Sequence, residues 1–205
     1  MALPDILPDD VIAADAESDA VKIHQWTREE YGQAAEAGLF KDRRVELVDG
    51  ALYDMAAQRS PHATGVRKVA RALEKIFAAG FDVRSQMPLS LGPLSEPEPD
   101  IAVVVGEPDD YQAHHPSTAV LVVEVADSSQ VHDRKRKAAL YARAELPDYW
   151  IVNLRLDLIE AFRDPSDGLY RTRRIYRRGE SISPLASPES SIAVDDLLPH
   201  HVPAS

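Results

Sequence analysis

The chain contains no cysteine among its 205 residues, which excludes a disulfide framework and thiolate chemistry. Its first residues lack the basic and apolar pattern of a secretion signal, and no apolar run approaches the length of a membrane span. Hydrophobic residues make up 44% and charged residues 28%, which is ordinary globular usage and argues against disorder over the whole chain. We therefore expect a cytoplasmic protein that makes no contact with a membrane.

Positive charge is also scarce, because 23 Lys and Arg face 34 Asp and Glu and leave a net charge of -11. This balance argues against a general nucleic-acid coat, since phosphate binding depends on Lys and Arg releasing counterions. The excess is uneven: residues 1–30 hold eight acids and two basic residues, and so carry -6. Two stretches are basic instead, Arg134–Lys137 and Arg171–Arg178. A folded part of the chain could therefore still present a basic face.

The length suits one domain with a sizeable core. Residues 1–22 are rich in Asp and Ala without sustained periodicity, and they are predicted to form a flexible acidic extension. A single domain is expected over residues 23–198, followed by a short tail over residues 199–205. The proline-containing end of the chain is predicted to be mostly irregular.

Hydrophobic periodicity and turn signals predict an ordered series of helices and strands. A helix with a capping box begins at Thr27, and Asp49-Gly50 marks a hairpin turn. The expected elements that follow are a helix over 62–80, strands over 81–91, 99–105 and 119–126, a helix over 133–144, a strand over 148–154, and two further strands over 158–164 and 170–178 separated by a turn at 165–168.

The helix expected between two buried strands requires a crossover and hence a parallel pair of strands. The fold class is therefore α/β, with helices packed in layers on a central mixed sheet and additional β-hairpins. Side chains alternate along a strand, so each carboxylate on these strands shares a face with residues two and four positions away. These sets are Asp100 with Ala102 and Val104, and Glu124 with Val122 and Val120.

Two of the expected strands carry a single carboxylate in otherwise apolar, β-branched surroundings. Asp100 lies at the edge of the segment EPDIAVVV, and Glu124 lies inside AVLVVEVA. An ionised group among Val and Ile costs several kcal/mol unless a cation compensates it. Lys137 is a candidate partner, because it shares one face of the next helix with Asp133 and Tyr141, whereas Lys135 points away from that face.

Two carboxylates and an ammonium group that meet at the end of a sheet can perform phosphodiester hydrolysis. They can hold a hard divalent cation, position a water molecule and stabilise charge that builds on a phosphate oxygen. Each residue also has a plainer interpretation. Asp100 could cap a turn after Pro99, Glu124 could form a structural ion pair, and Lys137 could be a solvated charge in a basic run.

An ordered set of motifs over residues 25–180 resembles the Uma-two family of restriction endonucleases, within the PD-(D/E)XK nuclease superfamily. These motifs are ELVDG, a proline with His62 opening a helix, QMPL, EPDIAVV, LVVEVADSS, DRKRK with LYARA, and PDYWIV. The resemblance implies a restriction endonuclease-like αβββαβ core. It also implies Asp100 as the metal-binding aspartate, Glu124 as the second acid, and the backbone carbonyl of Val125 as a further metal ligand.

The sequence departs from the superfamily pattern two residues after Glu124, where Ala126 replaces the usual lysine. The resemblance is to the subgroup in which this lysine has moved to the following helix, and there it is Lys137. Two other positions differ from the commonest form of the family. Glu145 stands where a helix-ending glycine is usual, and Asn153 stands where an aspartate is usual.

Three further residues are auxiliary candidates. Glu46 resembles the acid that some superfamily members add to the metal site, but an exposed hairpin carboxylate explains it nearly as well. Gln86 could hydrogen-bond the scissile phosphate or satisfy buried backbone, and His62 is more easily a structural histidine than a general base. His114 and His115 lack a third ligand at zinc-like spacing and are interpreted as loop residues.

The resulting hypothesis is a Mg²⁺-dependent DNA endonuclease, with Mn²⁺ as a substitute metal and duplex DNA as the partner. Asp100, Glu124 and the Val125 carbonyl hold the metal, Lys137 orients the attacking water or stabilises the transition state, and the arginine-rich stretches contact phosphates. The resemblance also implies a homodimer, although no stretch identifies an interface. Two alternatives stay open: an inactive nuclease-fold binding module of a mobile-element or defence system, and a hydrolase of another phosphoester.

Overall fold

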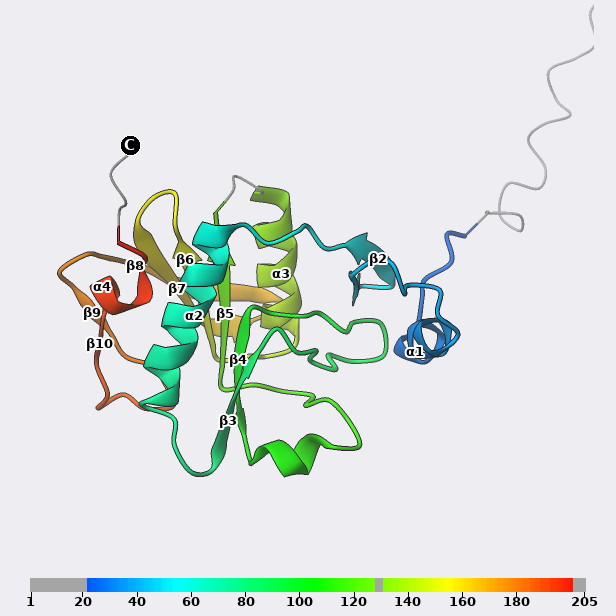
Figure 1. Cartoon of the computed structure of the whole chain (residues 1–205), viewed down its shortest axis with the longest axis horizontal. Coiled ribbons are helices and arrows are strands. Elements are labelled where there is room, and N and C mark those ends of the chain that lie inside the picture. Colours follow the sequence, from blue (N-terminus) through cyan, green and yellow to red (C-terminus); the bar gives the residue numbers. More distant parts are fainter. Residues whose placement is uncertain (1–21, 128–130, 201–205) are drawn as a thin grey trace, which may run out of the picture.

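The computed structural model describes residues 22–127 and 131–200, with the side chains of residues 131–134 left out (Figure 1). The acidic extension expected over residues 1–22 and most of the tail expected over residues 199–205 lie outside the described residues. None of the described helices is long and apolar enough to cross a membrane.

A six-stranded mixed sheet forms the centre of the molecule, in the order β3-β4-β5-β6-β7-β8. Only β5 and β6 pair in parallel, and the long helix α3 makes the crossover between them. The strands are β3 (Phe81–Ser85), β4 (Ile101–Val105), β5 (Leu121–Ala126), β6 (Asp148–Asn153), β7 (Leu158–Ser166) and β8 (Leu169–Arg177). With α2 before β3 and α3 after β5, this arrangement confirms the predicted mixed-sheet fold.

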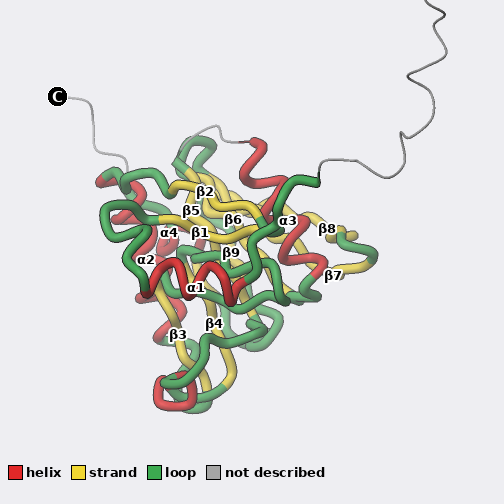
Figure 2. The backbone as a smooth tube through the Cα atoms, turned by 90° about the vertical axis from the view of Figure 1, so that its right-hand side faces the viewer, coloured by secondary structure: helices red, strands yellow, loops and turns green. Residues whose placement is uncertain are grey.

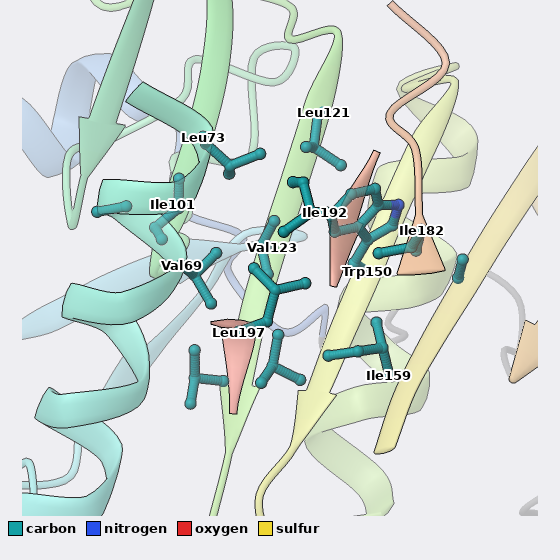
Figure 3. Close-up of a cluster of buried hydrophobic side chains, with 14 of the residues drawn as sticks. Val69, Leu73, Ile101, Leu121, Val123, Trp150, Ile159, Ile182, Ile192 and Leu197 are labelled. Atoms are coloured by element: carbon teal, nitrogen blue, oxygen red, sulfur yellow. The ribbon is translucent and has the colours of Figure 1, made fainter. Parts of the chain in front are cut away.

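The helices α2 (Ser60–Glu74) and α3 (Val131–Arg143) cover opposite faces of this sheet. Alternate residues of β4 and β5 point to different helices, as the strand period requires. The α2 side buries a cluster that includes Val69, Leu73, Ile101, Val123 and Trp150 (Figure 3). Burying each such side chain stabilises the fold by roughly 1.5–3 kcal/mol.

The α3 side of the sheet buries a second cluster, which contains Ala102, Val104 and Val122 together with Tyr141 and Tyr149. Asp100 and Glu124 precede or follow members of this cluster at a spacing of two, as expected. Val120 differs from the expectation, because it lies one residue before β5 and packs against the α2 side.

A smaller unit precedes the central sheet and lies on one side of it (Figures 1 and 2). It consists of α1 (Arg28–Glu36) and the hairpin of β1 (Val45–Val48) and β2 (Ala51–Asp54). The predicted capping box is present, since Thr27 and Glu30 exchange side-chain and backbone hydrogen bonds. The hairpin turns at Asp49-Gly50, where both residues adopt positive φ, of 51° and 76°.

Three segments differ from the sequence expectation. The strand expected to reach residue 91 ends at Ser85, because Gln86 adopts a φ of 54° that breaks the ladder. The β7–β8 turn falls at Asp167-Gly168, and Pro165 remains in β7. The loop over 106–118 contains one 3₁₀ turn, η2 (Pro108–Tyr111).

The end of the described chain is mostly irregular, as expected, and contains three short elements. These are β9 (Ser181–Ile182), β10 (Ile192–Ala193) and the short helix α4 (Val194–Leu197). Ile182, Ile192 and Leu197 are buried in the α2-side cluster. These isolated apolar residues cover the core, which short-range sequence patterns do not reveal.

Candidate active site

The two acids singled out from the sequence lie next to each other at one end of the sheet. Asp100 immediately precedes β4 and Glu124 lies near the end of β5, and the two strands are antiparallel with Ile101 opposite Val123. One more step in this register brings Asp100 beside Glu124. The first turn of α2 and the start of α3 lie at the same end of the sheet, uppermost in Figure 1.

Asp100 is held by three groups from three different parts of the chain. Its Oδ2 atom accepts a hydrogen bond from the backbone N–H of Val125 at 2.8 Å and lies 3.1 Å from His62 Nε2. Its Oδ1 atom accepts a longer bond of 3.4 Å from Gln86 Nε2. The orientation of this carboxylate is therefore fixed by β5, by α2 and by Gln86, the residue with positive φ that follows β3.

Glu124 shares its Oε1 atom between a cation and a hydroxyl donor, both on α3. Lys137 Nζ lies 3.2 Å from this oxygen, and the Tyr141 hydroxyl donates to it at 2.7 Å. The two donors are four residues apart, so one helix face supplies both. Among the residues described, none donates a hydrogen bond to the second oxygen, Oε2.

Lys137 also pairs with Glu46, whose Oε2 lies 3.3 Å from Nζ. Glu46 belongs to β1, is only 5% exposed, and accepts a hydrogen bond from the Glu98 backbone N–H at 3.3 Å. Arg136 approaches the other Glu46 oxygen at 3.8 Å and stacks on Tyr53 of β2 at 3.5 Å. The small N-terminal unit is thus tied to the site through α3.

Three carboxylates, those of Asp100, Glu124 and Glu46, influence one another in the site. Burial, together with the neighbouring carboxylates of Asp100 and Glu46, raises the pKa of Glu124 to about 7, although Lys137 and the hydrogen bond from Tyr141 oppose this rise. The hydrogen bond that His62 donates to the Asp100 carboxylate raises the pKa of His62, which favours the imidazolium beside that carboxylate. One ammonium group therefore does not compensate all the acids gathered here.

The structure brings all of the sequence-derived candidates into contact or near contact. Lys137 is 7% exposed, so its interpretation as a solvated charge was wrong, while Lys135 is exposed as expected. The interpretation of Glu46 as an exposed hairpin acid was also wrong. His62 and Gln86 both contact Asp100.

Tyr141 is a contact that the sequence reasoning did not assign. Its ring is fully buried between α3 and the sheet, and burial with the Glu124 charge raises its pKa well above the usual value, which keeps the hydroxyl a donor. The available signal was its position four residues after Lys137, one helical turn along the same face. Tyr149 and Trp150 of β6 are fully buried as well, which makes them core aromatics and not exposed platforms for stacking.

The two positions that depart from the common family pattern adopt identifiable conformations. Glu145 follows α3 with a φ of 56°, the left-handed conformation for which glycine is the usual residue. Asn153 ends β6, where its side chain accepts from the backbone N–H of Leu156 at 3.1 Å and donates to Glu160 at 3.3 Å. Asn153 therefore shapes the β6–β7 turn, and Glu145 preserves the helix end at a cost in backbone strain.

Among the described residues, no cluster of three His, Asp or Glu side chains is arranged to hold a metal ion. The oxygen donors at hand are the carboxylates of Asp100 and Glu124. Mg²⁺ commonly uses only one or two carboxylates and completes its shell with water and substrate phosphate. The Oε2 atom of Glu124, which accepts no hydrogen bond from a described residue, and the carboxylates around it fit such a cation.

Comparison with known proteins identifies the fold and the family of the chain. No curated protein matches the chain. Among solved structures, a crystal structure described as "a putative nuclease belonging to DUF820", from Anabaena variabilis, is similar to the chain with a TM-score of 0.63 and 12% sequence identity. The similarity covers 76% of this chain and 90% of that one, and it shows a shared fold. Residues 28–195, most of the length, match the Uma2 family, described as "Putative restriction endonuclease", and the chain therefore belongs to this nuclease family.

Proposed function

We propose that this chain is a Mg²⁺-dependent endonuclease that hydrolyses phosphodiester bonds of duplex DNA. One observation carries the proposal: the Asp100 and Glu124 carboxylates meet at one end of the sheet, with Lys137 Nζ 3.2 Å from Glu124. Membership in a restriction endonuclease family supports the reaction class. Asp100, Glu124 and the Val125 carbonyl would hold the cation, which supplies Lewis-acid polarisation of the phosphate and of the attacking water.

The remaining chemistry falls to the side chains of this chain. Lys137 carries a positive charge at the buried edge of the site, where it orients a water molecule and stabilises negative charge that develops on phosphate oxygens. Its second contact, with Glu46, restricts the direction of the ammonium group. The amine does not have to be ordered when substrate binds, which lowers the entropic cost of the reaction.

His62 and Tyr141 act as positioning residues in this proposal. His62 Nε2 and the Val125 N–H hold the Asp100 oxygen Oδ2, which leaves Oδ1 with only the long contact from Gln86. Tyr141 holds Oε1 of Glu124 and leaves Oε2 available to a cation. In each carboxylate, the oxygen with the weaker protein contacts would bind the cation.

The test measures cation binding and cleavage separately, with the full chain. Asp100→Asn and Glu124→Gln remove the two charges while keeping the shape of each side chain. Asp42→Asn and Glu74→Gln are matched controls, because both residues are exposed and neither contacts the site. Isothermal calorimetry with Mg²⁺ and a supercoiled-plasmid nicking assay with Mg²⁺ or Mn²⁺ provide the two measurements.

We expect the wild-type chain and both controls to bind Mg²⁺ and to nick DNA, and the two site variants to lose both properties. Nicking that survives in Asp100→Asn and Glu124→Gln would refute the assignment of the site. A chain that binds neither Mg²⁺ nor Mn²⁺ would instead support the binding-module alternative. Parallel assays with RNA and small phosphodiesters distinguish a hydrolase of another phosphoester.

A further inference from the structure

Two exposed arginines lie at the same end of the sheet as the candidate active site and take no part in its contacts. Arg155 belongs to the turn between β6 and β7, and Arg177 is the last residue of β8. Within residues 22–127 and 131–200, neither guanidinium group forms an ion pair. Three neighbouring arginines are paired: Arg171 with Asp167, Arg173 with Glu160, and Arg178 with Asp157 and Asp195.

The strand register fixes how these arginines lie relative to the site. Ala126, two residues after Glu124, pairs with Asn153 of β6. Asn153 pairs in turn with Leu158, and Leu158 pairs with Arg177. Neighbouring strands are about 4.8 Å apart, and three such spacings separate β5 from β8. Arg177 therefore lies roughly 14 Å across the sheet from β5, the strand that carries Glu124.

Arg155 lies within this span. The residue before it, Leu154, donates its backbone N–H to the Ala126 carbonyl at 2.9 Å, so the β6–β7 turn lies against the end of β5. In Figure 1 this turn rises at the upper edge of the molecule, at the same end as the first turn of α2 and the start of α3. The two arginines thus extend from the site along one end of the sheet.

The acids of the site and the negative charge of the chain disfavour DNA binding, and Arg155 and Arg177 offset this effect. The site gathers three acids, Asp100, Glu124 and Glu46, whose nearby cationic groups are already engaged with them, and the whole chain carries -11. Such a surface repels a phosphate backbone unless cations stand beside the acids. The major groove of duplex DNA is about 12 Å wide, close to the roughly 14 Å that separates β5 from Arg177 across the sheet.

We propose that Arg155 and Arg177 bind backbone phosphates of duplex DNA and hold the duplex across the end of the sheet while one strand enters the active site. The inference rests on the proposed function, which it deepens by assigning a substrate-binding surface. A plainer role is that charge on β8, the edge strand of the sheet, prevents strand pairing with other molecules. The two roles make different predictions about DNA affinity.

The experiment compares two double variants of the full chain. Arg155→Gln with Arg177→Gln removes the two unpaired charges. Arg71→Gln with Lys75→Gln is the matched control, because it removes two exposed, unpaired cations at the opposite end of α2 from His62. Fluorescence anisotropy with a labelled 30-base-pair duplex, without divalent cation and over a series of salt concentrations, measures affinity without cleavage.

Each lost phosphate contact lowers the slope of log affinity against log salt by about 0.9, so the Arg155/Arg177 variant should lose about 1.8 from this slope. At 0.1 M salt its affinity should fall roughly 10- to 60-fold on the same basis. The control variant should keep the wild-type slope and affinity. Melting temperatures of both variants should match the wild type, because neither change breaks an ion pair.

Equal losses in the two variants would overturn the inference, since they would show a general charge effect. Unchanged DNA binding in the Arg155/Arg177 variant would also overturn it. If DNA binding is unchanged but the Arg155/Arg177 variant loses affinity for a synthetic peptide of residues 1–21, the two arginines bind the acidic segment of the chain itself. Increased aggregation with unchanged DNA affinity would assign the arginines to protection of the sheet edge.

Failure of this inference is distinguishable from failure of the proposed function. DNA cleavage that depends on Asp100 and Glu124 but not on the two arginines would support the endonuclease assignment and refute the DNA-binding role of Arg155 and Arg177. DNA binding that depends on Arg155 and Arg177, without cleavage in the presence of any metal ion, would support the DNA-binding surface and refute the endonuclease assignment.

Discussion

Replacement of Lys137 by methionine tests whether one buried ammonium group holds the site together. Lys137→Met keeps much of the side-chain volume but leaves Glu124 and Glu46 buried near each other without their shared cation. A charge pair at 3.2 Å is worth about 5 kcal/mol in gross attraction at an effective dielectric constant of 20. The desolvation of lysine offsets part of this, and removing one partner of a buried pair typically costs about 3–5 kcal/mol net.

The pH dependence of this loss separates electrostatics from packing. Since the pKa of Glu124 already rises to about 7 in the presence of Lys137, it should rise further without it. At pH 5 the carboxyl is then neutral in the folded variant and the charge penalty is largely absent. We expect Lys137→Met to lower the free energy of unfolding by about 3–5 kcal/mol at pH 8 and by less than about 2 kcal/mol at pH 5.

Urea unfolding followed by tryptophan fluorescence at both pH values measures these differences. Lys135→Met is the matched control, because Lys135 is exposed on the same helix, and it should change stability by less than about 0.5 kcal/mol. A loss for Lys137→Met that is equal at pH 5 and pH 8 would refute the electrostatic reasoning and leave only lost packing. A loss below about 1 kcal/mol at pH 8 would show that the cation is not needed to bury the acids.

Three further changes test separate features of the site and its supports. Folding raises the pKa of Glu124 from 4.5 to about 7, so the folded state binds more protons than the unfolded state between these pH values. The free energy of unfolding of the wild type should therefore fall by roughly 3 kcal/mol as pH rises from 4.5 to 7. In urea titrations, Glu124→Gln should reduce this dependence of stability on pH. Gly65→Ala places a methyl group 2.9 Å from Val125 Cγ1, and the overpacking should outweigh the gain in helix propensity and lower the unfolding free energy by roughly 1 kcal/mol. Glu145→Gly removes the strain of a side chain at φ 56° and should raise the melting temperature by about 1–4 °C in scanning calorimetry, whereas an unchanged or lower value would show that the helix end is unstrained.

The composition of this nuclease-family chain is strongly acidic, yet several of its basic side chains lie at or near the candidate active site. Lys137 is buried between two acids, and Arg136 lies against Glu46 and Tyr53. Arg155 and Arg177 lie instead at the surface near the same end of the sheet. The buried cations therefore stabilise the acids, and in the proposal above these two exposed arginines bind phosphate.

Much of the fold followed from the sequence because its signals are local. Continuous apolar, β-branched runs defined β4 and β5, the Asp49-Gly50 turn defined the β1–β2 hairpin, and the spacing of Lys137 and Tyr141 placed both on one helix face. A helix between two buried strands then required the parallel pair at the centre of the sheet. These inferences depend only on short-range geometry, which each segment carries with it.

Tertiary structure alone decided how distant segments meet. Sequence patterns offered Glu46, His62 and Gln86 only as auxiliary candidates beside plainer interpretations, and the packing of distant segments brought Glu46 to Lys137 and the other two residues to Asp100. The same is true of the end of the chain, where Ile182 and Leu197 are ordered by the core they cover. The sequence determined which groups were available and on which face of each element they lay, whereas burial and charge compensation between elements, which depend on contacts far apart along the chain, determined which of them came together.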